Sequence, residues 1–207
     1  MREIEWQEAK TFILNYEWLG NMGTSKYCYG LLFGNQLAAV VCYGPLVAPS
    51  QYSKLFDKDI SRGLLQICRG ASIFWAPKWA PSKLISSSLK MLKNRLGSEL
   101  ILVMAYANPE AGEIGTIYQA CNAYYLGETS PGGGKRYIIN GHSYDPRKVY
   151  KKFGSRKKEH LLKVDKNYSK EEINPKHRYL FIRGSSKKRK EILNQVRDLI
   201  KAYPKRF

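Results

Sequence analysis

The sequence contains no run of about 18 consecutive apolar residues, which is the length that a membrane-spanning helix requires. Its first ten residues, MREIEWQEAK, include acidic side chains and lack the apolar segment of a secretory signal peptide. Both absences predict a cytoplasmic protein that has no membrane as its partner. The 207 residues, of which 43% are hydrophobic, are nevertheless numerous and apolar enough to bury a core.

Several well-known catalytic and metal-binding patterns are also missing. The four cysteines (Cys28, Cys42, Cys68 and Cys121) form no CxxC pair and no Cys/His cluster with zinc spacing, which favours reduced thiols in the core. No Walker or GxGxxG loop is present, and the three histidines suggest no Ser-His-Asp arrangement. The candidate reactive residues are therefore those at the strand-to-helix junctions of the predicted fold and not members of these motifs.

Acidic residues are scarce, with 17 Asp and Glu against 35 Lys and Arg and a net charge of +18. The excess is concentrated in residues 145–207, which hold 21 basic and 7 acidic residues. Such a basic surface attracts polyanions, because neutralising phosphates releases counterions. A merely soluble basic face or a tail on an anionic membrane are alternatives, but the aromatic residues interleaved with the charges favour nucleic acid.

The uneven charge predicts two regions: a catalytic core over residues 1–144, and a basic region over residues 145–207 that completes the fold and contacts DNA. The cations expected at the DNA are Lys151, Lys152, Arg156, Lys157, Lys158, Lys176, Arg178, Lys187, Lys188 and Arg189.

Hydrophobic periodicity and turn residues predict an α/β fold with a mixed sheet. Helices are expected over residues 4–14, 83–96, 112–127 and 187–207, the second with Ser82 as N-cap and the last closed by Pro204. Strands are expected as a hairpin over 27–44 around Gly34-Asn35, singly over 64–74, 99–107 and 174–184, and as a pair within 124–141.

The first expected strand-to-helix junction runs from Arg69 to the helix that follows Ser82. Free amides at a helix N-terminus form an anion site, and the side chains of Ser82, Lys83 and Ser86 would add donors. Together with Arg69 and Gly70, they could hold the pyrophosphate of a cofactor. The alternative is an ordinary capped helix.

The second junction follows the apolar strand 99–107, at whose carboxyl end an α/β sheet binds ligands. Tyr118 could act there as a general acid, and Glu113 as a base, with Asn108 nearby. The alternative is that Tyr118 is a core aromatic residue with one hydrogen bond.

The segment AYANPEAGEIGTIYQACNAYYLG, residues 105–127, closely resembles the GTIYQA-containing block of the phage Mom-like DNA modification proteins. The resemblance extends over most of the chain, through LQICRGASIF, APSKLISSSLKML and the basic C-terminal segments. It implies an acetyltransferase fold of the GNAT type, with acetyl-CoA as the suspected donor. It also implies transfer of a small methylcarbamoyl- or acetamido-like group to adenine N6, which protects phage DNA from restriction in the host cytoplasm. Arg69, Ser82 and Tyr118 match the functional residues of the family.

Three positions depart from the family pattern: Gln66 and Asn108 replace acidic residues, and Glu113 replaces a histidine. If the family binds iron there, the metal site of this chain is altered or lost. Two other functions therefore stay open: an N-acetyltransferase acting on a protein or small amine, and a non-catalytic DNA-binding relative.

An adenine taken out of the duplex would need aromatic surfaces on which to stack. Trp75, Trp79, Tyr43 and Tyr29 are the candidates near the predicted site.

Overall fold

The computed structural model describes residues 1–47, 49–130, 134–144 and 146–205, and it contains two compact units. The first unit comprises Met1–Ala107, Ile114–Gly127 and His177–Phe207. The second unit comprises Asn108–Glu113 and Glu128–Lys176. The boundary predicted at residue 144 falls inside the second unit, so the basic last third of the chain contributes to both units.

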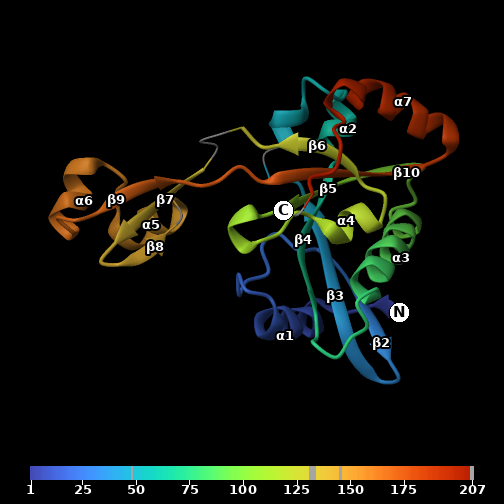
Figure 1. Cartoon of the computed structure of the whole chain (residues 1–207), viewed down its shortest axis with the longest axis horizontal. Coiled ribbons are helices and arrows are strands. Elements are labelled where there is room, and N and C mark those ends of the chain that lie inside the picture. Colours follow the sequence, from blue (N-terminus) through green and yellow to red (C-terminus); the bar gives the residue numbers. More distant parts are fainter. Residues whose placement is uncertain (48, 131–133, 145, 206–207) are drawn as a thin grey trace. The chain divides into compact units, whose positions relative to one another are not determined.

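The first unit is built on a seven-stranded sheet with the order β1-β2-β3-β4-β5-β10-β6 (Figure 1). β4 and β5 run parallel, whereas β1–β2, β2–β3, β3–β4 and β5–β10 are antiparallel pairs. The predicted α/β class with a mixed sheet is thereby confirmed. The strands are β1 (Arg2–Glu3), β2 (Tyr27–Phe33), β3 (Gln36–Pro45), β4 (Leu65–Ser72), β5 (Leu100–Ala107), β6 (Tyr124–Glu128) and β10 (His177–Gly184).

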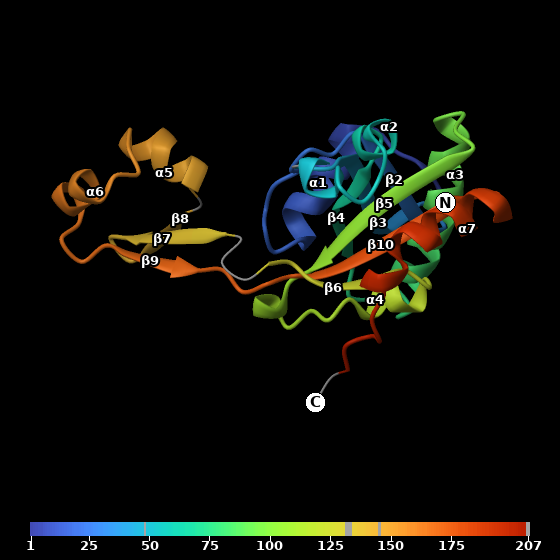
Figure 2. The same ribbon diagram turned by 90° about the horizontal axis from the view of Figure 1, so that it is seen from above.

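Helices cover both faces of this sheet because successive strand residues alternate between the faces. Val41 and Tyr43 of β3 pack in one cluster with Leu84 and Leu89 of α3, whereas Val40 packs in another with residues of α1. Figure 2 shows α1 and α2 on the side of the sheet opposite α4. The helices are α1 (Trp6–Tyr16), α2 (Lys58–Arg62), α3 (Ala80–Arg95), α4 (Thr116–Ala120) and α7 (Ser186–Val196), with 3-10 turns η1 (Pro49–Tyr52), η2 (Pro109–Ala111) and η3 (Arg197–Leu199).

The second unit has a three-stranded antiparallel sheet with the order β8-β7-β9 and two helices. Its elements are β7 (Lys135–Ile139), β8 (His142–Tyr144), α5 (Pro146–Phe153), α6 (Lys158–Val164) and β9 (Ser169–Glu172). Its core is a cluster of four buried residues, Tyr137, Ile139, Val149 and Leu161. This unit was not predicted, since the sequence interpretation assigned only one strand to residues 128–176.

Three of the expected helices differ from the structure. The expected start after Ser82 is wrong, because α3 begins at Ala80 with Pro81 in its first turn, a position that tolerates the missing N–H. The helix expected over 112–127 is wrong, because only Thr116–Ala120 is helical before β6 begins. The last helix ends at Val196 rather than near Pro204.

The expected strand pair within residues 124–141 is also wrong in its pairing, since β6 and β7 belong to different sheets. Within the described part of the chain, no helix is long and apolar enough to cross a membrane.

Candidate functional site

The sheet of the first unit opens between its two central parallel strands. β4 and β5 pair only at Leu65–Val103 and Gln66–Met104, although each strand has eight residues. Beyond these pairs the strands diverge, as Figure 1 shows, and the rest of β4 pairs with β3 alone. The edge of β4 that faces β5 therefore offers backbone donors and acceptors at the carboxyl ends of parallel strands, where α/β sheets bind ligands.

The start of α3 leaves fewer free donors than the sequence predicted. The Ser82 hydroxyl donates to the Trp79 carbonyl at 2.9 Å and does not cap the helix. The amides of Ala80 and Lys83 donate to the carbonyls of Pro77 and Trp79, and Pro81 has no N–H. Among the first-turn amides of this described helix, Ser82 alone is left to donate to a ligand, supported by the exposed Lys83 ammonium.

Arg69 does not lie beside Ser82. Its partner across the sheet is Cys42, whose side chain packs on the α1 face, whereas α3 covers the opposite face. The Arg69 guanidinium donates to the Asn21 carbonyl at 2.5 Å, and it also bonds the Asn21 side chain and the Cys68 carbonyl. The carboxylate of Glu17 is 3.9 Å away. Arg69 therefore anchors the loop that follows α1.

Gly115 and Gln119 anchor α4 to the first unit. Gly115 has φ of 76°, and a Cβ there would collide with the Tyr179 ring, so only glycine allows this approach. The amide of Gln119 donates to the Tyr179 hydroxyl and to the Ile114 carbonyl, both at 3.1 Å. The Tyr179 hydroxyl in turn donates to the Ile114 carbonyl. These contacts explain why small and amide residues surround Tyr118.

Tyr118 lies half-buried on α4, on the same face of the sheet as α3. Its ring is 5.4 Å from that of Tyr179 and 6.2 Å from that of Phe181, measured between centroids. The ring also packs against the cluster that contains Val103, which is still paired with β4, and Ala105, which lies just beyond the last pair. A side chain in this position is packed as a core aromatic and still lies beside the opening.

Asn108 and Glu113 belong to the second unit, where they close a turn on themselves. The Asn108 amide oxygen accepts from the Glu110 backbone at 3.2 Å, and the Glu113 carboxylate accepts from the Asn108 backbone at 3.0 Å. Glu110 in turn accepts from Arg136 at 3.1 Å. Both predicted catalytic side chains therefore support local backbone geometry.

The predicted DNA-contacting cations fall into two sets. In the second unit Lys151, Lys152, Arg156, Lys157 and Lys158 are exposed on and between α5 and α6. Lys152 also donates to the Tyr144 hydroxyl at 2.8 Å.

Lys176, the last residue of the second unit, is half-buried, and its backbone donates to Thr129. In the first unit Lys187 and Arg189 are exposed at the start of α7, and Lys188 is half-buried. Arg178 is half-buried and donates to the Leu126 carbonyl at 2.8 Å, which supports β6.

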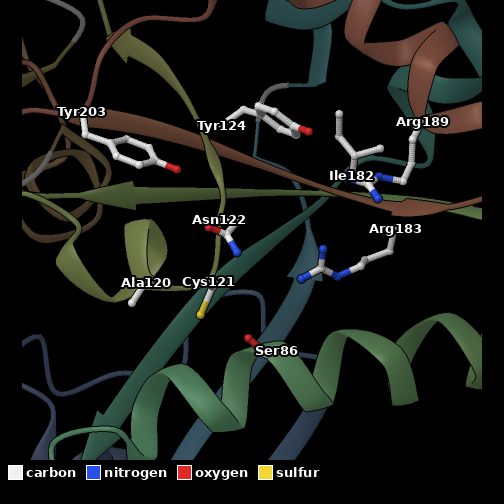
Figure 3. A pocket seen from close by; sticks show the side chains of 9 residues that line it. All are labelled: Ser86, Ala120, Cys121, Asn122, Tyr124, Ile182, Arg183, Arg189 and Tyr203. Atoms are coloured by element: carbon white, nitrogen blue, oxygen red, sulfur yellow. The ribbon is translucent and has the colours of Figure 1, made fainter. Parts of the chain in front are cut away.

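A pocket of about 420 Å³ lies in the first unit, and nine residues line it (Figure 3). Its polar side chains include Ser86, which the sequence had assigned to a cofactor, and Arg189, which it had assigned to DNA. Arg183 was missed, although an available signal was its position at the end of an apolar strand, on the same face as Tyr179 and Phe181. The lining residues are Ser86, Ala120, Cys121, Asn122, Tyr124, Ile182, Arg183, Arg189 and Tyr203.

Two of the four aromatic residues expected to stack on a base are excluded from that role. Tyr29 and Tyr43 are fully buried, and the Tyr43 hydroxyl forms a 2.7 Å hydrogen bond with Ser88. Trp75 and Trp79 remain exposed between β4 and α3, and both rings pack against Phe33 at the tip of the β2–β3 hairpin. Phe74 beside them is 94% exposed, so aromatic surface is available at this loop.

Metal ligands do not gather in the described part of the chain: no group of three or more His, Cys, Asp or Glu side chains there could hold a metal ion. The four cysteines are buried free thiols, as predicted.

Solved structures with a similar arrangement of elements are N-acetyltransferases. One is described as a phosphinothricin N-acetyltransferase (12% identity, 89% of this chain and 97% of that chain, TM-score 0.44). Another is the polyamine N-acetyltransferase of Drosophila melanogaster (11%, 87% and 97%, TM-score 0.43). A third is an agmatine N-acetyltransferase (10%, 87% and 98%, TM-score 0.41).

The family assignment comes from the sequence. The model of the Mom protein family matches residues 1–205, and the chain belongs to this family. The resemblance inferred from the GTIYQA block is thereby confirmed. A search of curated proteins found no match.

Proposed function

We propose that this protein is a DNA-modifying transferase that adds a small acyl-type group to the N6 amine of adenine. The observation that carries the proposal is membership of the Mom protein family over residues 1–205. The opening between β4 and β5 and the exposed cations of the second unit are consistent with it. Modified adenine would protect phage DNA from host restriction.

The opening between β4 and β5 is the proposed site for the acyl donor, for which acetyl-CoA is the candidate. The unpaired edge of β4 could form backbone hydrogen bonds to an amide-containing arm, much as a neighbouring strand would. The Ser82 amide and the Lys83 ammonium could meet its phosphates. The residues present therefore fit a donor of this kind, with fewer backbone donors than a dedicated phosphate loop has.

When the adenine amine attacks the acyl carbonyl, a C–N bond forms and the C–S bond of acetyl-CoA breaks. Tyr118 is proposed either to protonate the leaving thiolate or to orient the base at this opening. The adenine amine is a weak nucleophile and is paired in duplex DNA, so the base must leave the stack at a cost of a few kcal/mol. Stacking on Trp75 or Trp79 would offset part of that cost, at roughly 1–3 kcal/mol per base. Cations of the second unit would hold the DNA backbone without reading much sequence.

The direct test is to incubate the purified protein with duplex DNA and acetyl-CoA and to analyse the nucleosides by mass spectrometry. We expect modified deoxyadenosine, and about 10²–10⁴-fold less of it with Tyr118→Phe, which keeps the ring and removes the hydroxyl. Tyr16→Phe, at an exposed tyrosine of α1, is the matched control and should retain full product. Unmodified adenine under conditions where another family member is active would contradict the proposal.

A second experiment tests the DNA contact separately from the chemistry. Replacing Lys151, Lys157 and Lys158 by Gln should weaken DNA binding, and the salt slope of log K should decrease by about 0.9 for each phosphate that the variant no longer neutralises. The control replaces Lys54, Lys58 and Lys90, which are equally exposed in the first unit. Equally weakened binding in both triple variants would mean that the second unit has no special role in binding.

One observation favours a second candidate function, a non-catalytic DNA-binding relative. Two of the positions that depart from the family pattern, Asn108 and Glu113, are engaged in closing their own turn. DNA binding without product, together with no thermal shift on adding acetyl-CoA, would support this alternative. Acetylation of a protein or small amine without DNA binding would instead support a simple N-acetyltransferase.

A further inference from the structure

Among the described residues that line the pocket in the first unit are two arginines. Arg183 comes from the end of β10 and Arg189 from α7, and none of the described lining residues is Asp or Glu. Neither arginine forms an ion pair with a described carboxylate. Figure 3 shows the Arg183 guanidinium reaching toward Cys121 and Asn122, above Ser86. The pocket is therefore positively charged and is not neutralised from within the described chain.

Arg183 has an unsatisfied donor inside this pocket. Its Nε atom is buried and has no hydrogen-bond partner among the residues that the structure describes. A buried donor on a charged group is costly when it is unpaired, and an oxyanion can accept from Nε and a terminal nitrogen of the same guanidinium at once. Burial raises the pKa of the neighbouring Cys121 thiol, while Ser86 and Arg183 oppose that shift, so the thiol does not supply the missing anion at neutral pH.

Two tyrosines, Tyr124 and Tyr203, line the pocket. Tyr203 donates its hydroxyl to the Ala123 carbonyl at 2.9 Å, which holds the ring in place while part of it stays exposed. Tyr124 is half-buried beside it, and the exposed Arg189 completes the rim. Asn122 has φ of 55°, a conformation that Asn tolerates better than most residues, and its amide lines the same space. One cavity thus contains hydrogen-bond donors, positive charge and flat aromatic surfaces.

We propose that this pocket binds a nucleoside phosphate, with the phosphate on Arg183 and Arg189 and the base against Tyr124 and Tyr203. A volume of about 420 Å³ lies in the usual range for small-molecule sites, roughly 300–1,000 Å³. Guanidinium groups suit phosphate because of their planar fork, and aromatic rings accept any base by stacking. The Asn122 amide and the Ser86 hydroxyl can donate to or accept from the remaining polar atoms.

This pocket adjoins the proposed donor site at α3, where the Cys121 thiol donates to the Ser82 carbonyl at 3.2 Å, but its arginines lie away from the opening between β4 and β5. Arg183 pairs with Ile101 near the beginning of β5, whereas the opening starts beyond Met104. Three residues of strand separate the two positions by about 10 Å. The inference therefore does not depend on acyl transfer. The nucleoside phosphate could be a free nucleotide or one nucleotide of a DNA strand.

The test measures binding of AMP, adenosine, inorganic phosphate and the single-stranded trinucleotide of deoxyadenosine to the full chain by isothermal titration calorimetry. We expect AMP to bind at least about tenfold more tightly than adenosine and than phosphate alone. Competition between the trinucleotide and AMP, with tighter binding of the trinucleotide, identifies DNA as the source. Weaker trinucleotide binding identifies a free nucleotide.

Variants assign the binding to this pocket. Arg183→Met should reduce AMP affinity about tenfold or more, Arg183→Lys less, and Arg189→Gln by a smaller factor at the exposed rim. Lys190→Gln, on the next exposed residue of α7, removes the same charge outside the pocket and should have no effect. Thermal unfolding checks that Arg183→Met folds, and Arg189→Gln tests the same site if it does not.

Equal affinity for AMP and adenosine, or unchanged AMP affinity in both Arg183→Met and Arg189→Gln, would overturn the proposal. Inorganic phosphate binding as tightly as AMP would overturn the role of the two tyrosines. Detection of modified adenine is independent of these outcomes, so failure of this inference and failure of the transferase proposal can be told apart.

Discussion

The two units use their positive charges differently. In the second unit Lys151, Lys157 and Lys158 are exposed to solvent on and beside α5 and α6, around a core of buried residues. In the first unit Arg69 and Arg178 donate to backbone carbonyls, and Arg183 has a buried Nε inside a pocket. One basic segment of sequence thus contains cations that hold the fold together, cations that face a cavity and cations that face solvent.

The cores differ as much as the charges. The first unit has three clusters of buried residues on the two faces of a seven-stranded sheet, and the second has one small cluster. A small core leaves little reserve of stability, because less apolar surface is removed from water. We therefore expect the second unit to lose its structure more readily when one core residue is truncated.

The largest expected effect is Leu161→Ala in the second unit. Leu161 is fully buried, and its truncation should cost about 2–5 kcal/mol, enough to unfold so small a core. Hydrogen exchange should then show loss of protection in β7, β8 and β9 while β5 and β10 stay protected. Leu162→Ala, at a residue that is 38% exposed, is the control. Loss of protection in both units together would mean that they unfold as one.

Gly115→Ala should have the next largest effect, and in the first unit. The new Cβ would collide with the Tyr179 ring and would also be strained at positive φ, so we expect a loss of about 2–4 kcal/mol in unfolding free energy. Gly112→Ala is the control, since Gly112 also has positive φ but, its two chain neighbours aside, no described atom lies within 4 Å of its Cβ position. That change should cost only about 1 kcal/mol. Equal losses of unfolding free energy in urea would show that the strained backbone, and not the contact with Tyr179, causes the loss.

Tyr43→Phe should cost the first unit about 1 kcal/mol at neutral pH, because it removes a buried hydrogen bond with Ser88. Ser88→Ala in the Tyr43→Phe background removes the partner as well and should add little further loss, apart from any effect of the smaller side chain. A urea-unfolding cycle of the two single variants and the double variant measures their coupling. Additive losses would indicate that the two hydroxyls do not act as a pair.

Tyr29→Phe should have the smallest effect on stability at pH 7, and its effect should depend on pH. Burial raises the pKa of Tyr29 to about 12, and its hydroxyl has no hydrogen-bond partner within the described part of the chain, so removal should change stability at pH 7 by less than about 1 kcal/mol. A phenol that ionises near pH 10 when unfolded stabilises the fold fully below that pH, and this contribution is lost as pH rises through 12. Tyr29→Phe should therefore flatten the alkaline decline in unfolding free energy. An unchanged decline would mean that other groups, such as Tyr43, cause it.

Much of the fold could be predicted because local sequence patterns determine many of its helices and strands. The β2–β3 hairpin around Gly34-Asn35, the strands β4, β5 and β10, and helix α1 all follow from alternation, helical period or turn residues. The second unit could not be predicted in this way. Its strands are three to five residues long. Charged residues, as in the SKEE of β9, leave no alternation of apolar and polar residues to detect.

The candidate site was predicted less well than the fold. Tyr118 packs against the cluster that contains Ala105 of β5, and its role stays a prediction, whereas Arg69 and Ser82 were expected together and lie on opposite faces. The irregular register of β3 and β4 between Cys42 and Tyr43 determines the face on which Arg69 lies, and a bulge of this kind has no clear sequence signal.

The sequence by itself determined which groups are available. These are the charge of +18, the free cysteines, the GTIYQA block and the strands that precede and follow this block. Only the tertiary structure decided how these groups combine. β10 lies between β5 and β6 although they are separated from it in sequence, and this places Arg183 with Ser86, Cys121 and Arg189 in one cavity. Periodicity reports which face of a strand is buried, whereas the residues that meet on that face depend on long-range pairing, which local sequence does not encode.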